Sequence, residues 1–217
     1  MTSYDKTPRT TLRRIPERGV YDRAAVHAIL DEALVCHLGF VIDGQPYVIP
    51  TFVVREGEVI YVHGAAASRA LKTLEAGMAA CVTVTLLDGL VLARSAFHHS
   101  MNYRSVVVLG TAREVRDRDE KLRILDAFVE KVSAGRSREA RGANEKELAA
   151  TRVLAMDIVE ASAKVRTGPP KDDDEDADIP IWAGVIPLRP VAGAAVPDGD
   201  MAGRPVPVLR HPFRADR

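Results

Sequence analysis

The chain has 217 residues, of which 47% are hydrophobic and 28% are charged. This composition is that of a globular protein, and the length suffices for a core that buries roughly 70% of the unfolded chain's surface. Thirty basic residues balance thirty acidic ones, so no net charge attracts nucleic acid or anionic lipid. We therefore expect neither a nucleic acid nor a membrane as a partner.

The apolar runs are too short to cross a bilayer, and no signal-peptide core follows Met1. The two cysteines, Cys36 and Cys81, lie among apolar residues, which is typical of buried free thiols in a reducing compartment. Both observations predict a cytoplasmic protein.

The first half of the chain begins with an arginine-rich stretch at 1–18 without an apolar period, which predicts a surface arm. Asp22 then precedes a helix with one apolar face. Three extended segments follow, and the Asp43-Gly44 pair between the first two is among the strongest hairpin signals. These three predicted strands are 35–42, 45–54 and 59–63.

The second half begins with a short helix from Ser68 that Gly77 ends. A second hairpin is predicted around Asp88-Gly89, between strands at 78–87 and 90–97, and a long strand covers 103–115. Asp117 begins a clear helix. The predicted buried stripe of that helix is Leu122, Leu125, Phe128, Val129 and Val132.

Asn144 begins a shorter helix, and the residues from Leu154 to Ile158 alternate as in a half-buried strand. Six or seven strands joined mostly by hairpins predict a mainly β protein: a small antiparallel β-barrel with flanking helices. We expect one domain at 19–190, with an N-terminal arm at 1–18 and a Pro/Gly-rich tail at 191–217.

A candidate phosphate site follows the third predicted strand. There a loop of small residues leads into a helix that opens with Ser68, Arg69 and Lys72. Free backbone N–H groups, a hydroxyl and two cations are suited to a phosphomonoester. The alternative is that Ser68 merely caps the helix while the cations are solvated.

A second polar segment runs from His98 to Ser105 and is suited to a planar heteroaromatic ligand with several acceptors. His98 and His99 point to opposite faces if extended, so we expect no metal site there. His63 ends a strand just before the candidate phosphate loop, and it is either a partly buried structural histidine or a group that reaches a ring system.

Four segments together resemble a known family: 18–22, 47–51, 61–72 and 98–110, with a further similarity at 164–170 and 182–188. The chain resembles the pyridoxamine 5′-phosphate oxidase-like FMN-binding split barrels. Within them it is most similar to flavin-nucleotide-binding proteins grouped with 5-nitroimidazole-resistance reductases.

The resemblance implies a six-stranded antiparallel split barrel and a homodimer with FMN at the subunit interface. It places Ser68, Arg69 and Lys72 at the FMN phosphate and His63 beside the flavin as a catalytic candidate. The remaining implied flavin contacts are Ile49, Pro50, Thr51, Asn102, Tyr103, Arg104 and Ser105.

The expected function is that of an FMN-dependent oxidoreductase that reduces small, nitroaromatic-like acceptors, with NADH, NADPH or a cellular reductase as the electron donor. Ala70 stands where the oxidase itself has a lysine, and its C-terminal substrate signature has no counterpart here, so we do not expect pyridoxamine phosphate oxidation. The alternatives are a flavin-binding carrier or sensor without turnover, and a member that uses haem or a deazaflavin instead of FMN.

Overall fold

A computed structural model describes residues 2–75, 77–199, 201 and 203–207. Residues 208–217 of the predicted tail lie outside the described residues. The strands in the described part of the chain are β1 (Gly19–Val20), β2 (Val35–Ile42), β3 (Gln45–Glu56), β4 (Val59–Ala65), β5 (Ala79–Leu92), β6 (Ser100–Glu114), β7 (Thr151–Asp157), β8 (Glu160–Arg166) and β9 (Gly184–Pro187). The α-helices are α1 (Arg23–Glu32), α2 (Arg69–Glu75), α3 (Arg118–Val132), α4 (Arg136–Glu139) and α5 (Glu145–Ala150).

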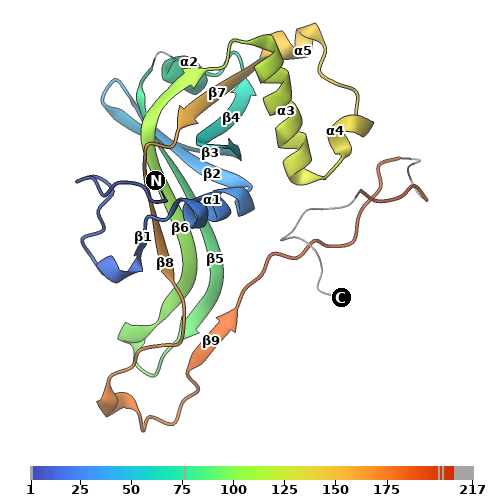
Figure 1. Cartoon of the computed structure of the whole chain (residues 1–217). Helices are drawn as coiled ribbons and strands as arrows, with labels where there is room; N and C mark the ends of the chain where they lie inside the picture. The colour runs from blue at the N-terminus through green and yellow to red at the C-terminus, as the bar shows by residue number, and fades with distance from the viewer. Residues whose placement is uncertain (1, 76, 200, 202, 208–217) are drawn as a thin grey trace.

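Six strands close a ring of antiparallel pairings in the order β6-β7-β4-β3-β2-β5, and β5 pairs again with β6 (Figure 1). This ring confirms the predicted mainly β, six-stranded antiparallel fold. Strands β1, β8 and β9 extend the sheet from β6 and β5.

The main core lies inside the ring, because alternate side chains of each strand point inward. Leu38, Ile60, Val82 and Leu154 are each at most 2% exposed there, and α1 adds Leu30. Burial of each such side chain contributes roughly 1.5–3 kcal/mol, so this cluster is the main source of stability.

The turn at Asp43-Gly44 is confirmed: both residues have positive φ, 50° and 77°, as the tight hairpin between β2 and β3 requires. The second predicted hairpin, at Asp88-Gly89, is wrong. β5 runs straight through these residues with only a shift of register between Leu87 and Gly89. The Asp88 carboxylate pairs with Arg104, and the backbone of Gly89 pairs with Pro187 of β9, so neighbouring strands hold the segment extended.

Two further strand predictions need correction. β7 is buried on both faces rather than one, because Val153 and Ala155 pack under α3 while Leu154 and Met156 face the ring. β8 had no signal in the sequence, since its small residues Ala161 and Ala163 have low β propensity and contribute by close packing.

The N-terminal arm is anchored by Tyr4, which is 3% exposed and reaches the core. Its hydroxyl donates to Glu58 and contacts His27, at 2.8 Å each. In the described part of the chain no helix is long and apolar enough to cross a membrane.

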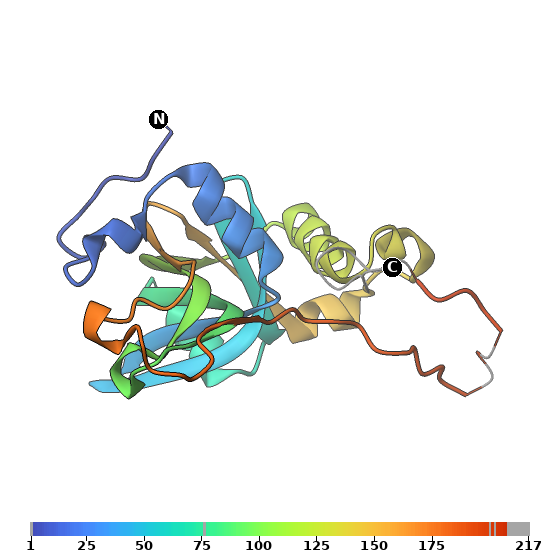
Figure 2. The same cartoon turned by 90° about the horizontal axis from the view of Figure 1, so that it is seen from below.

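The helix α3 forms a second layer on the outer face of the ring, beside β4 and β7 (Figures 1 and 2). Asp117 caps it as predicted and accepts a hydrogen bond from the Glu120 N–H at 2.7 Å. Ile124 and Phe128 are buried against the strands. Val129 and Val132 of the predicted stripe are 37% and 47% exposed, so the described part of the chain leaves part of the apolar face of this helix uncovered.

Candidate functional site

A cavity of about 580 Å³ adjoins the uncovered face of α3, a volume typical of small-molecule and cofactor pockets. Strand residues Phe52 and His63 line one part of it. The rest of the lining is Leu125, Asp126, Phe128, Val129, Val132, Ser133, Arg136, Ser137, Ala140, Arg141, Gly142, Ala143, Glu147 and Thr151. We call this cavity the α3 pocket.

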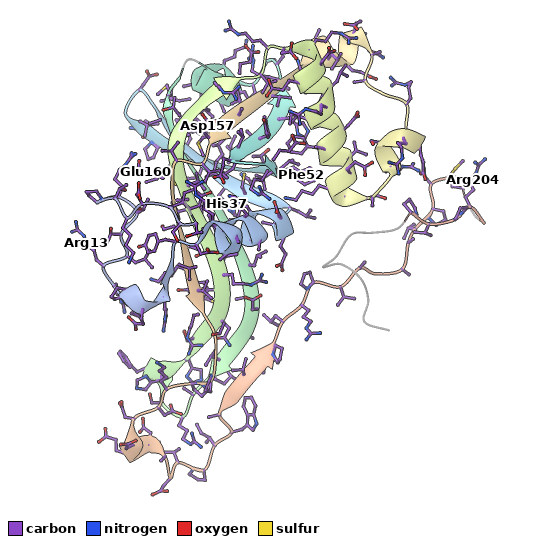
Figure 3. The ribbon with its side chains drawn as sticks, viewed as in Figure 1. Arg13, His37, Phe52, Asp157, Glu160 and Arg204 are labelled. Carbon is purple, nitrogen blue, oxygen red and sulfur yellow. The ribbon has the colours of Figure 1, made fainter. Side chains whose placement is uncertain are left out.

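Aromatic contacts attach α3 to the sheet at this pocket. Phe128 packs edge-on against Phe52 of β3 and against His63 of β4, with ring centroids 5.2 and 4.3 Å away. Figure 3 labels Phe52 between the strands and α3. His63 points outward because Val62 points into the core and successive side chains of a strand alternate.

The imidazole of His63 is the one titratable strand side chain in the pocket lining. Its Nδ1 atom is buried and has no hydrogen-bond partner among the described residues, although buried polar atoms are usually paired. Burial lowers the pKa of His63 below its usual 6.5, so the ring is neutral at pH 7. A neutral imidazole on an apolar wall can bind a metal ion that a ligand brings with it.

The predicted phosphate residues lie at the start of α2. Ser68 caps this helix, since its Oγ accepts from the Leu71 N–H at 3.5 Å. Arg69 and Lys72 are exposed. The Arg69 guanidinium stacks over Tyr47 of β3 at 5.4 Å and approaches its hydroxyl at 3.4 Å. Ser68 therefore caps the helix, and the role of Ser68, Arg69 and Lys72 in phosphate binding stays a prediction.

Ile49, Pro50 and Thr51 lie in the middle of β3 and pair with β2. The contact between Arg69 and Tyr47 brings the start of α2 to this strand. The structure thus brings Arg69 to Tyr47, two residues before the predicted flavin contacts on β3.

The third predicted group, on β6, is engaged in contacts within the chain. Arg104 forms ion pairs with Glu32 and Asp88, with shortest distances of 2.5 and 2.8 Å. Asn102 accepts from Arg166 and donates to the Gly168 carbonyl.

Ser105 donates to the Lys164 carbonyl, and Tyr103 pairs with Arg166 in the ladder between β6 and β8. The roles of Asn102, Tyr103, Arg104 and Ser105 in flavin binding stay predictions.

The β6 group does not join the other two within one chain. Strands β2 and β5 separate β3 from β6 around the ring, a distance of roughly 14 Å at about 4.8 Å per strand.

Most of the α3 pocket was not expected from the sequence. The one available signal was the helix itself, whose apolar residues cover more surface than one packed face needs. No pattern in the sequence pointed to Arg136 or Arg141, because arginines in polar segments are typical of any protein surface.

The sequence was compared with profiles of known protein families. The profile of the pyridoxamine 5′-phosphate oxidase family matches residues 22–165, which span the whole ring and α3. The chain belongs to this family. The family resemblance seen in the sequence is thereby confirmed, and comparison with curated proteins gives no match.

Among solved structures, the flavocytochrome Anf3 from Azotobacter vinelandii shares 43% identity over 95% of this chain and 94% of its own, with a TM-score of 0.82. The FAD and heme binding protein from Mycobacterium smegmatis shares 38% identity over 88% of this chain and 94% of its own, with a TM-score of 0.83. A candidate 5-nitroimidazole antibiotic resistance protein from Bacteroides thetaiotaomicron, at 20% identity, covers 68% of this chain and 86% of its own. Its TM-score of 0.58 shows a common fold.

The buried His63 predicts a pH dependence of stability. Its pKa is lowered in the folded state, so below about pH 6.5 the unfolded chain binds the proton more readily and stability falls. We expect His63→Leu to lose less stability than the wild type between pH 7.5 and pH 5, measured by urea unfolding of ligand-free protein.

The matched control is His37→Leu, an exposed histidine on β2 of the same ring. It should lose as much stability as the wild type over that interval. An identical pH dependence in His63→Leu and wild type would contradict a buried, neutral imidazole.

Proposed function

We propose that this protein binds both a flavin and a haem and acts as a flavin-dependent redox protein. The observation that supports haem is the α3 pocket, which has the volume of a ligand site. The His63 imidazole lies in its apolar wall, and the Nδ1 atom of that ring has no hydrogen-bond partner among the described residues. A histidine in an apolar pocket is the usual protein ligand of haem iron. The names of the two relatives, a flavocytochrome and an FAD and heme binding protein, support this pair of cofactors.

The residues of the pocket fit a haem. Phe52, Phe128, Val129 and Val132 offer apolar contact to a macrocycle, and exposed valines on α3 are explained if a ligand covers them. Haem bound here would supply a one-electron iron centre whose imidazole ligand His63 is already neutral.

The flavin belongs, in this proposal, to the separate group at the start of α2 and the middle of β3. Arg69 would bind a phosphate through its forked guanidinium, with Ser68 and Lys72 beside it. The sequence predicts FMN, and the names of the two relatives favour FAD. We take FAD as the flavin, and release of the cofactor from purified protein decides between the two. The flavin would accept electrons from NADH, NADPH or a cellular reductase.

The protein is a homodimer in this proposal, with flavin contacts from both protomers. The two predicted flavin groups stand apart on one ring, which supports a shared site. Exposed apolar side chains gather on β5, β6, β9 and the segments beside these strands, and such a surface is typical of a protein interface. We call this surface the apolar patch. Its side chains are those of Leu87, Leu90, Phe97, Met101, Ile181, Trp182 and Ile186.

The decisive experiment on haem is the absorption spectrum of the protein reconstituted with haemin and flavin. We expect His63→Ala to lose the haem Soret band while the flavin absorption remains, because only the iron ligand is removed. His37→Ala should keep both absorptions. A Soret band of wild-type position and intensity in His63→Ala would contradict the assignment.

Addition of NADH or NADPH to the same samples tests turnover. Bleaching of the flavin in wild type and in His63→Ala, with reduction of haem in wild type alone, would support electron flow through the flavin. Retained flavin that neither donor bleaches would favour the alternative of a flavin-binding carrier or sensor.

The phosphate assignment predicts weaker flavin binding in Arg69→Ala. We expect a loss of about 1.5–3 kcal/mol, the range for charge-assisted hydrogen bonds, measured by fluorescence titration of flavin into apoprotein. Arg116→Ala, which removes a guanidinium that is 82% exposed, should leave the affinity unchanged. Equal affinity in Arg69→Ala and wild type would refute the assignment.

The dimer proposal predicts that the side chains of the apolar patch hold two protomers together. Phe97→Ser combined with Trp182→Ser should shift the protein toward monomer in light scattering and reduce its flavin content. The matched control is Val159→Ser, an exposed valine between β7 and β8. A monomer that retains full flavin would contradict a cofactor shared between protomers.

A further inference from the structure

Two arginines line the α3 pocket away from the sheet. Arg136 lies on α4, and Arg141 lies in the segment between α4 and α5. Figures 1 and 2 both show α4 on the side of α3 that is farther from the strands. The strand residues Phe52 and His63 belong to the opposite side. The pocket therefore has an apolar region with an imidazole and a polar region with two guanidinium groups and the Glu147 carboxylate.

The position of Arg136 is set by the turn between α3 and α4. The Glu130 carboxylate accepts hydrogen bonds from the Gly135 N–H at 2.7 Å, the Ser137 N–H at 3.0 Å and the Ser137 hydroxyl at 2.6 Å. These bonds, led by that of Ser137, lower the pKa of Glu130 to about 2. Gly135 adopts a φ of 86° that turns the chain. The carboxylate thus holds the first residues of α4 against α3 at any ordinary pH.

The position of Arg141 is set by the start of α5. Glu147 and Asn144 form a reciprocal capping box, with both backbone bonds at 2.9 Å. The same Glu147 carboxylate accepts from both terminal nitrogens of Arg141, at 2.7 and 3.0 Å. Arg141 therefore stands at the pocket on a locally ordered turn.

Both arginines are available to an anionic ligand. The side chain of Arg136 is 49% exposed and pairs with Glu139 through one nitrogen at 2.8 Å. That of Arg141 is 68% exposed. An exposed ion pair such as that of Arg136 contributes at most about 1 kcal/mol, whereas the bidentate pair of Arg141 with Glu147 is stronger. A guanidinium has five donors, so a carboxylate from a ligand can add to these pairs through the remaining N–H groups.

We propose that Arg136 and Arg141 bind the two propionate carboxylates of a haem seated at His63, so that the pocket selects a porphyrin with free acid groups. This inference rests on the proposed function. The chemistry of the pocket matches that ligand at each end: an apolar wall for the macrocycle, an imidazole for the iron and two forked cations for two carboxylates. The arginines act in binding and selectivity and leave the iron ligand unchanged.

The test compares haemin with haemin dimethyl ester, titrated into apoprotein and followed by the Soret band. The double variant Arg136→Gln with Arg141→Gln should bind haemin at least tenfold more weakly, equal to about 1.4 kcal/mol. Its affinity for the ester should equal that of the wild type, because the ester has no carboxylate to lose. Arg138→Gln, on the same helix but outside the described pocket lining, is the matched control and should behave as wild type with both ligands.

Substitution of both arginines by lysine should restore part of the haemin affinity, because the charge remains while the fork is lost. Arg136→Gln alone keeps the Arg141–Glu147 contact and so separates binding from any loosening of the α5 cap; it should weaken haemin binding selectively. Equal weakening for haemin and ester, or no weakening, would overturn the inference. Failure of the proposed function has a different signature: a Soret band that persists in His63→Ala, or no haemin binding by the wild type.

Discussion

The edge-on packing of Phe128 against Phe52 and His63 is the contact on which the α3 pocket depends. It attaches α3 to the outer face of β3 and β4 along one side of the helix. Ile124 and Phe128 pack against the strands, whereas Val129 and Val132, in the last turn of the helix, remain exposed. A helix with an apolar surface wider than its packed face leaves a wall that a ligand can cover. The pocket is a consequence of how α3 packs on the strands.

The burial that makes the wall apolar also determines the state of His63. A histidine in contact with an aromatic ring and shielded from water loses its proton more readily, so its pKa falls and the neutral form dominates at pH 7. Aromatic packing thus gives the pocket a group able to bind iron. Arg136, Arg141 and Glu147 of the pocket lie on the side formed by α4 and α5, where carboxylates hold the turns.

The two candidate cofactor sites stand in different parts of the fold. The group at Ser68, Arg69 and β3 depends on the start of α2 and its contact with Tyr47, whereas the α3 pocket depends on the second layer outside the ring. The family profile spans the ring and α3 alike, at residues 22–165, and in this chain α3 with its following turns builds a cavity on the outer face of the ring. In the proposed function, the flavin and the haem would be held by strands of the same sheet.

The sequence by itself determined the mainly β antiparallel fold, the hairpin at Asp43-Gly44 and the helix after Asp117, because these depend on local geometry and on the period of apolar residues. It also predicted the family from segments spread over the chain. The tertiary structure alone decided that β5 passes straight through Asp88-Gly89, since the ion pair with Arg104 and the pairing with β9 outweigh a local turn preference. It alone showed the α3 pocket as well, because a cavity forms where residues distant in sequence, such as His63 and Arg141, line one space without filling it.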